Sequence, residues 1–311
     1  MPDTLSNVIP GAYVSVEQLL GLRFRPIPDA PLRSKNVTGR QIGLRLSKQK
    51  GRGVDFAEVR LYQPGDDIRS IDWRVTARKN VPHTKVFREE RERPALLFID
   101  QSQHMFFGSQ QRLKSVAAAE LAARIAWQIT ASGDRVGGMV LDNHGHHLFR
   151  PFRTVRATGR LMQQVALSNQ QLTRPEPDTA NPEAALSRLS SGLGALALLR
   201  QRHHQIFIIS DLAGPLDLWR SSLHRLARHH QVHVLQICDP LDSELPPTGV
   251  YNIVHGNQNI SFFSGDTALR GRYASDHEKR NAQIVELCRH PSLTHRKLST
   301  ADTDWDSLAW N

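Results

Sequence analysis

The sequence predicts an α/β protein in which a doubly wound sheet follows a β-rich N-terminal portion. Two short apolar runs, 95–99 and 206–209, each stop at or just before an acidic residue, as strands buried on both faces of a parallel sheet do. Segments with helical spacing of apolar residues alternate with such runs, which is typical of a doubly wound α/β fold. With 311 residues, the chain suits one large domain or two modest ones.

Residues 1–93 form the expected N-terminal portion, which shows little helical periodicity beyond a short helix near 16–20. Alternation of polar and apolar residues over 54–62 predicts a half-buried strand, and 84–90 predicts another. Up to Arg93 the chain holds 18 Lys and Arg against 11 Asp and Glu, so this portion is basic.

Residues 94–311 form the expected α/β domain, in which strands alternate with helices. The expected strands are 95–99, 136–141 paired with a hairpin strand at 147–149, 206–209 and 232–237. The expected helices are 113–130, 155–167, 182–202 and 216–229. The tail adds a strand pair within 250–263, a helix near 268–288 and a strand near 296–298.

Composition and motifs exclude several classes of protein. No stretch approaches 18 uninterrupted apolar residues, and the first residues lack the basic start and apolar run of a secretory signal. Two cysteines, Cys238 and Cys288, can form neither a disulfide framework nor a CxxC metal site. Phosphate-binding glycine loops, a nucleophile elbow and the HExxH motif are missing. We therefore expect a cytoplasmic protein that is not an enzyme.

A basic segment, residues 31–54, carries seven Lys and Arg and no acidic residue. Such a run favours an anionic partner, and a solvated segment without a partner is an equally open interpretation. The segment contains no aromatic residue that could stack on the bases of single-stranded nucleic acid. Nucleic-acid binding through this segment is the alternative function for the chain.

Acidic residues follow two of the predicted parallel strands. Asp100 and Asp211 each come at a strand end, and Ser102 follows Asp100 by two residues. Ligands of open α/β sheets bind at the carboxyl ends of the strands, and Mg²⁺ prefers oxygen ligands. The residues therefore predict an oxygen-rich site, although Asp at such turns also serves as a helix cap.

A long block of this sequence resembles the signature of the domain of unknown function 58 family. The block comprises 51–56 and 60–73, the second reading RLYQPGDDIRSIDW, and it continues with Ala77-Arg78 and 85–90. Later matches are 100–108, 209–211 and 239–246, so the resemblance spans Gly51 to the C-terminus. It implies a von Willebrand factor A-like, Rossmann-like sheet with helices on both faces.

The resemblance also implies a function. Members of the family usually accompany MoxR-type AAA+ ATPases and are thought to act as their partners or adaptors in maturing, assembling or metal-loading other proteins. Some members carry N-terminal transmembrane helices, and this sequence resembles the soluble branch. We therefore expect a non-enzymatic adaptor that binds a MoxR-type ATPase.

The von Willebrand A fold often holds a divalent metal through the pattern D-x-S-x-S, a distant Thr and a distant Asp. Carried over, the pattern places Asp100, Ser102, Thr179 and Asp211 at the metal, with His104 where the second Ser belongs. An imidazole shifts preference from Mg²⁺ toward Mn²⁺ or Zn²⁺. We therefore expect a degenerate site that holds a divalent metal weakly or not at all.

The signature block supplies the other candidate surface, for binding a partner. Its polar and aromatic residues are Tyr62, Asp66, Asp67, Arg69, Asp72 and Trp73. The competing interpretation is an internal salt-bridge network that locks the N-terminal portion onto the α/β domain, with Trp73 as apolar anchor. A pairing of Arg69 with Asp66 or Asp72 would satisfy either interpretation.

Overall fold

The computed structural model describes residues 9–24, 50–51, 55–88, 94–172, 181–197, 203–255 and 258–302. The chain forms two compact units. The larger one combines Met1–Arg33 with Pro94–Asn311, and the smaller one is Ser34–Arg93.

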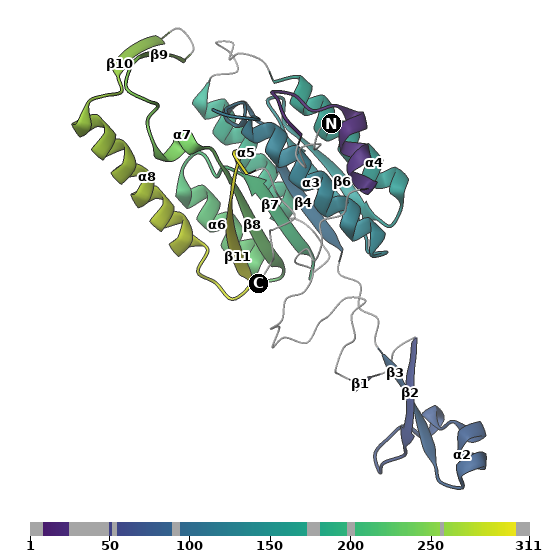
Figure 1. Cartoon of the computed structure of the whole chain (residues 1–311). Helices are drawn as coiled ribbons and strands as arrows, with labels where there is room; N and C mark the ends of the chain where they lie inside the picture. Colours follow the sequence, from purple (N-terminus) through teal and green to yellow (C-terminus); the bar gives the residue numbers. More distant parts are fainter. Residues whose placement is uncertain are drawn as a thin grey trace, which may run out of the picture. The chain divides into compact units, whose positions relative to one another are not determined.

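The larger unit is built on a six-stranded sheet with the strand order β11-β8-β7-β4-β5-β6 (Figure 1). Its strands are β4 (Ala95–Asp100), β5 (Val136–Leu141), β6 (His146–Phe152), β7 (Gln205–Ser210), β8 (Gln231–Cys238) and β11 (Leu293–Ser299). All neighbours are parallel except β6, which runs antiparallel to β5. The chain winds outward from β4 in one direction and from β7 in the other, so the strand order reverses between β4 and β7. The predicted doubly wound α/β fold class is confirmed.

The uninterrupted apolar runs of the sequence follow from burial on both faces of this sheet. In β4, Leu97 and Ile99 belong to one core cluster, whereas Leu96 and Phe98 belong to the other. Successive side chains of a strand point to opposite faces, so a strand covered on both sides must be apolar at every position.

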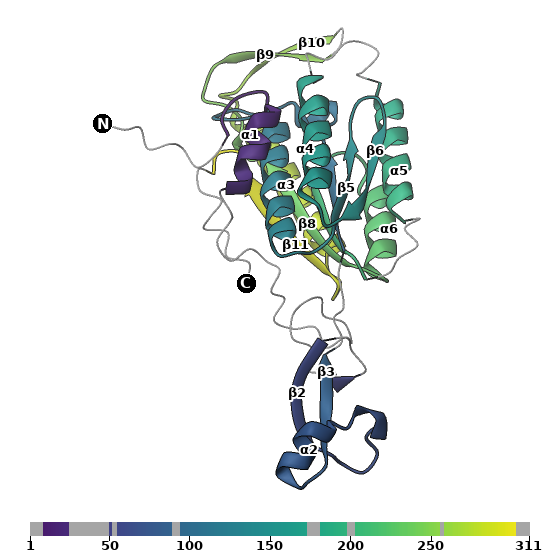
Figure 2. The same ribbon diagram turned by 90° about the vertical axis from the view of Figure 1, so that its right-hand side faces the viewer.

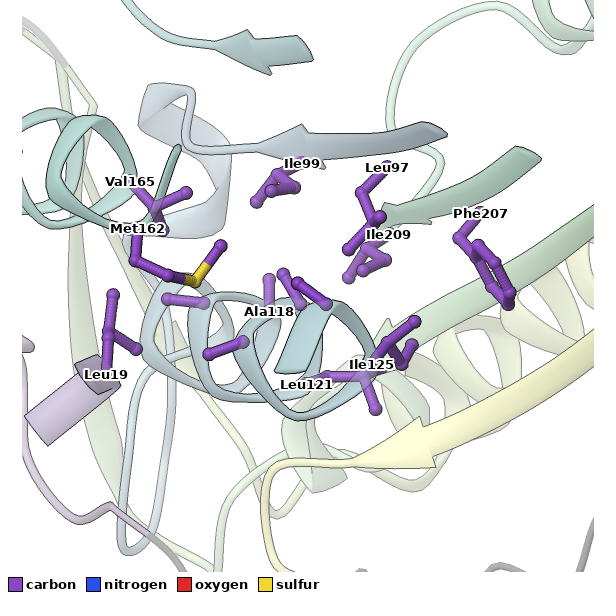
Figure 3. Packing of buried hydrophobic residues seen from close by; sticks show 14 of the residues in the cluster. Leu19, Leu97, Ile99, Ala118, Leu121, Ile125, Met162, Val165, Phe207 and Ile209 are labelled. Carbon is purple, nitrogen blue, oxygen red and sulfur yellow. The ribbon is translucent and has the colours of Figure 1, made fainter. Parts of the chain in front are cut away.

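Helices cover both faces of the sheet (Figure 2). One core cluster joins it to α1 (Val16–Gly21), α3 (Lys114–Ala131) and α4 (Val155–Gln170). The other joins it to α5 (Pro182–Ala197), α6 (Leu216–Ala227) and α8 (Thr267–Leu287). Figure 3 shows the first cluster, where Leu121 of α3 and Met162 of α4 pack with strand residues such as Ile99. The small alanines of α3 let this helix, which is buried along most of its length, lie close to its neighbours.

The N-terminal segment 9–24 packs onto the larger unit, which differs from the expected division at residue 93. The indole Nε1 of Trp127 donates to the carbonyl of Leu19 at 2.8 Å, and the amide of Val14 donates to Asn169 Oδ1 at 2.8 Å. Leu19 is fully buried in the core cluster. The basic composition of residues 1–93 hides these few apolar residues, because an average over the segment is dominated by its charges.

The smaller unit contains a three-stranded sheet in the order β1-β3-β2. Its elements are β1 (Lys50–Gly51), β2 (Asp55–Leu61), a 3-10 turn at Ile68–Ser70, α2 (Trp73–Lys79) and β3 (His83–Arg88). The two predicted strands, 54–62 and 84–90, correspond to β2 and β3. Helix α2 is absent from the prediction. It is capped by Asp72, whose side chain accepts from the amides of Arg74 and Val75, and it ends at Asn80 in the left-handed conformation.

A hairpin and short helices complete the larger unit. Strands β9 (Val250–His255) and β10 (Gln258–Phe263) pair antiparallel, and α7 (Pro240–Ser243) follows β8. Short 3-10 turns lie at Leu22–Phe24 and Gln103–Met105. Among the described residues, no helix has both the length and the apolar composition that crossing a bilayer requires. The basic segment 31–54 lies outside the described residues except for Lys50 and Gly51.

Candidate functional site

Two acidic residues meet at the carboxyl edge of the sheet, where the strand order reverses. Asp100 ends β4 and Asp211 follows β7, and Ile99 is in register with Ile209 on these adjacent parallel strands. Asp100 is fully buried, and the side chain of Asp211 is mostly buried. The sheet topology thus joins two carboxylates that are 111 positions apart in the chain.

Hydroxyl and amide groups surround the Asp100 carboxylate. Ser102 donates to Oδ1 through its hydroxyl and through its backbone amide, the latter at 3.1 Å. The hydroxyl of Ser210, which is also fully buried, donates to Oδ2 at 2.7 Å. Both oxygens of the buried carboxylate are therefore hydrogen-bonded, as a buried charge requires.

The ring of His104 lies between the two carboxylates. It belongs to the 3-10 turn Gln103–Met105 that follows β4. Its Nε2 is 3.2 Å from Asp100 Oδ2 and 3.2 Å from Asp211 Oδ1, and its Nδ1 is 3.2 Å from the hydroxyl oxygen of Ser102. The side chain is 34% exposed, so one edge of the ring reaches the surface.

Lys114 brings a second cation to the same edge. It is the first residue of α3, and its Nζ is 3.4 Å from Asp211 Oδ2 and 2.8 Å from Asp242 Oδ1. The same ammonium lies 5.3 Å from the centre of the Phe107 ring, a cation–π arrangement. Asp242 belongs to α7, so the site joins the ends of β4, β7 and β8.

Mutual attraction fixes the charged state of these groups. Burial works against a charged His104 ring, but the carboxylates of Asp100 and Asp211 outweigh it and raise the pKa of His104 well above its ordinary value. Burial likewise opposes the charge on Asp211, but His104 and Lys114 lower the pKa of this carboxyl to about 2. The pKa of Asp100 is also lowered, because His104 overcomes the cost of burial.

A metal ion is one group that such a set could hold. Asp100, His104 and Asp211 each offer a ligand atom, and these atoms lie within 4.8 Å of one another. The set does not fit Mg²⁺, because the gap between the carboxylates faces a ring nitrogen and Asp211 is already paired with an ammonium. Thr179, the expected distant ligand, lies outside the described residues.

Comparison with known proteins identifies the family. The model described as "Protein of unknown function DUF58" matches residues 58–283. The chain belongs to the DUF58 family. An uncharacterized protein of Mycobacterium tuberculosis is 32% identical over 259 residues, which cover 82% of this chain and 77% of that protein. An uncharacterized protein of Mycobacterium avium is 30% identical over 128 residues, 40% of this chain and 73% of that protein.

Solved structures similar to this DUF58 protein include a conserved hypothetical protein BatB from Bacteroides thetaiotaomicron. It has 13% identity and a TM-score of 0.33 over 64% of this chain and all of that one. A von Willebrand factor type A protein from Catenulispora acidiphila has 11% identity and a TM-score of 0.28 over 50% of this chain and 35% of that one.

The DUF58 signature block lies in the smaller unit, where its acidic residues have specific local partners. Arg60 makes two hydrogen bonds to Asp66, at 2.8 and 2.6 Å, and these hold the pKa of Asp66 below its ordinary value. Asp72 lies 3.7 Å from Lys85 and caps α2, and Asp67 caps the 3-10 turn before it.

The carboxylates of Asp66 and Asp72 pair with Arg60 and Lys85, and not with Arg69. Arg60 on β2 faces the turn that carries Asp66, whereas Arg69 lies on the 3-10 turn with its side chain exposed. Trp73 is 68% exposed and Tyr62 is half-buried. The two interpretations of the block, partner surface and lock, both remain predictions.

Three residues of the sheet-edge site were not predicted from the sequence as site residues: Lys114, Ser210 and Asp242. Lys114 looks like an ordinary helix-start residue, and Ser210 looks like the last residue of an apolar strand. Their position in the chain does carry a signal, because each stands at or beside the carboxyl end of a parallel strand or at the helix start facing it.

Proposed function

We propose that this DUF58 protein is a non-enzymatic adaptor of a MoxR-type AAA+ ATPase, acting in the maturation or assembly of other proteins. It would bind its partner with the carboxyl edge of the six-stranded sheet. The identity of the partner rests on the resemblance of the signature block to proteins that accompany such ATPases.

One observation carries the choice of a binding role over a hydrolytic one, namely the way the Ser102 hydroxyl is used. A nucleophilic serine needs a neighbouring base that can take its proton. Ser102 instead donates a hydrogen bond to Asp100, whose lowered pKa makes it a weak base, and the ring of His104 faces two carboxylates through Nε2. These contacts leave Ser102 and His104 as parts of a fixed polar network, which supports recognition rather than acyl transfer.

The neighbourhood of the network supports a docking surface. The rings of Phe107 and His104 are both partly exposed beside the buried ammonium of Lys114. An exposed aromatic ring next to desolvated charges is the composition from which binding hot spots are built. The polar network would then fix the direction of groups that a partner meets.

Binding to the purified MoxR-type ATPase of the same organism tests the proposal. We expect Phe107→Ala to weaken the affinity by roughly tenfold, the scale of a hot-spot truncation. The matched control is Phe24→Ala, which also removes an exposed ring but lies at the end of the N-terminal segment. Equal affinities of wild type and Phe107→Ala would remove this edge as the interface, and no association of the wild-type protein would remove the adaptor role.

A further inference from the structure

We propose that the side chain of His104 takes the place of a divalent cation between Asp100 and Asp211, so that this edge of the sheet is held together without a metal. The consequence for recognition, that partner binding does not need a metal, rests on the proposed adaptor function. The first statement concerns the chain alone and can be tested without any partner.

Hydrogen-bond accounting supports a cationic ring. Carboxylate oxygens that are ionised only accept, so Nε2 of His104, at 3.2 Å from an oxygen of Asp100 and of Asp211, must carry a hydrogen. The hydroxyl oxygen of Ser102 lies 3.2 Å from Nδ1 and 3.5 Å from Nε2, and that hydroxyl gives its own proton to Asp100. A ring held against two ionised carboxylates is favoured in its positively charged form.

The position of Nε2 is the one a bridging cation would take. It is equally far from Asp100 Oδ2 and Asp211 Oδ1, which come from adjacent strands. Two like charges held this close repel each other unless a positive group lies between them. The ring supplies that group from the same loop that holds Ser102, at a fixed place in the fold.

The chain supplies further partners to all four oxygens of the two carboxylates. Asp100 accepts from Ser102 and Ser210, and Asp211 accepts from the amide of Ala213 at 2.9 Å and faces Lys114 at 3.4 Å. Lys114 is in turn shared with Asp242. A metal ion entering this network would have to displace the His104 ring and break hydrogen bonds to a fully buried carboxylate.

Removal of the ring should therefore create a metal site rather than destroy one. Mn²⁺ is the suitable probe, because it accepts carboxylate and hydroxyl ligands. We expect chelator-treated wild-type protein to show no saturable Mn²⁺ binding in isothermal titration calorimetry and no change of Tm with EDTA or Mn²⁺. We expect His104→Ala to have a Tm lower by several degrees, and Mn²⁺ to bind it saturably and restore part of the loss.

Two controls keep the experiment decisive. His144→Ala, an exposed histidine on the loop after β5, should behave as the wild type in both measurements. His104→Ser, which restores the D-x-S-x-S pattern with an oxygen ligand, replaces His104→Ala should that variant fail to fold. Saturable Mn²⁺ or Zn²⁺ binding to the wild type that either His104 variant loses would make His104 a ligand and overturn the proposal. A variant that neither binds Mn²⁺ nor is stabilised by it would overturn it equally.

The partner arm separates this inference from the adaptor role. With the MoxR-type ATPase as probe, we expect equal affinity in EDTA and in Mn²⁺ for the wild-type protein. Loss of binding in EDTA would contradict a metal-free site, whereas absence of binding in both buffers would contradict the adaptor role and leave the calorimetric result standing.

Discussion

The hydroxyl of Ser210 donates to Oδ2 of Asp100 at 2.7 Å, and so ties together the carboxyl ends of the two strands between which the sheet reverses its order. The same hydroxyl oxygen accepts from the amide of Leu212 at 3.1 Å, a residue in the left-handed conformation with φ of 58°. Ser210 thus stabilises both the buried charge of Asp100 and the turn at Leu212 that positions Asp211.

Replacement of Ser210 by Ala tests this tie. The change leaves a buried carboxylate with one donor fewer, so we expect the free energy of unfolding to fall by about 2 kcal/mol, the scale of a hydrogen bond to a charged group. Urea denaturation measures it. Ser221→Ala, which removes an exposed hydroxyl on α6, is the matched control and should change stability by less than about 0.5 kcal/mol. Equal stabilities of the two variants would show that the bond contributes nothing.

Glu120 anchors the N-terminal segment through a buried ion cluster. Its carboxylate accepts from Arg112 Nη1 at 2.6 Å, from Arg124 Nε at 2.9 Å and from the amide of Ile9 at 2.9 Å, and all three charged side chains are buried. Glu120→Gln keeps the shape but removes the carboxylate charge that both buried guanidinium groups share. We expect a loss of about 3 to 5 kcal/mol.

Urea denaturation measures this loss, and limited proteolysis tests whether the N-terminal segment 9–24 becomes accessible to cleavage. Glu286→Gln, whose exposed partner Arg289 lies 3.1 Å away on the surface, should leave stability nearly unchanged. A Glu120→Gln protein as stable as the wild type would mean that the cluster is replaceable by neutral hydrogen bonds.

His230, which lies at the amino edge of the sheet directly before β8, is expected to make the stability of the protein depend on pH. Burial, with the neighbouring His204 ring next, lowers the pKa of His230 from 6.5 to about 4. Its Nδ1 accepts from the amide of His204 at 3.2 Å, and a proton there would end this hydrogen bond. Below the unfolded pKa the unfolded chain binds the proton more readily, so stability falls as pH decreases from 6.5 toward 4.

His230→Asn provides the test, because its side-chain oxygen can accept the same amide hydrogen without titrating. We expect the variant to lose less stability than the wild type between pH 7 and 5, when urea midpoints are compared. His144→Asn, at an exposed position on the loop after β5, should keep the wild-type dependence. Parallel curves for wild type and His230→Asn would assign the effect to other groups.

The predictable part of the fold is the part that short-range patterns determine. The runs 95–99 and 206–209 gave β4 and β7, and the helical spacing after Leu113 gave α3, because burial on both faces or on one stripe is written in consecutive residues. Helix α2 was not predicted, because its seven residues are mostly polar and exposed and its start is determined by its cap rather than by a periodic apolar pattern. The packing of 9–24 onto the larger unit was not predicted, because it depends on contacts with residues more than 100 positions away in the chain.

The candidate site also has a part that the sequence predicts and a part that it does not. Asp100 and Asp211 could be predicted from their position at strand ends, and their meeting follows from the reversal of strand order. The role of His104 could not be predicted, since a sequence reports the missing serine but not where the ring points. Lys114 reaches the site from the start of a helix, and a side-chain direction of that kind is fixed by packing.

Trp73 of the signature block gives the last prediction, which separates a binding role from a stabilising one. The ring is 68% exposed at the first position of α2, and Ile68 nearby is also exposed. Trp73→Ala removes little buried surface, so we expect the free energy of unfolding to change by less than about 0.5 kcal/mol. If the block is a partner surface, the affinity for the MoxR-type ATPase should fall by roughly tenfold, as for a truncated aromatic anchor.

Asp72→Ala is the contrasting variant: it removes the cap of α2 and should cost about 1 kcal/mol of stability. A Trp73→Ala protein that unfolds more easily but binds normally would instead favour the ring as an apolar anchor within the chain.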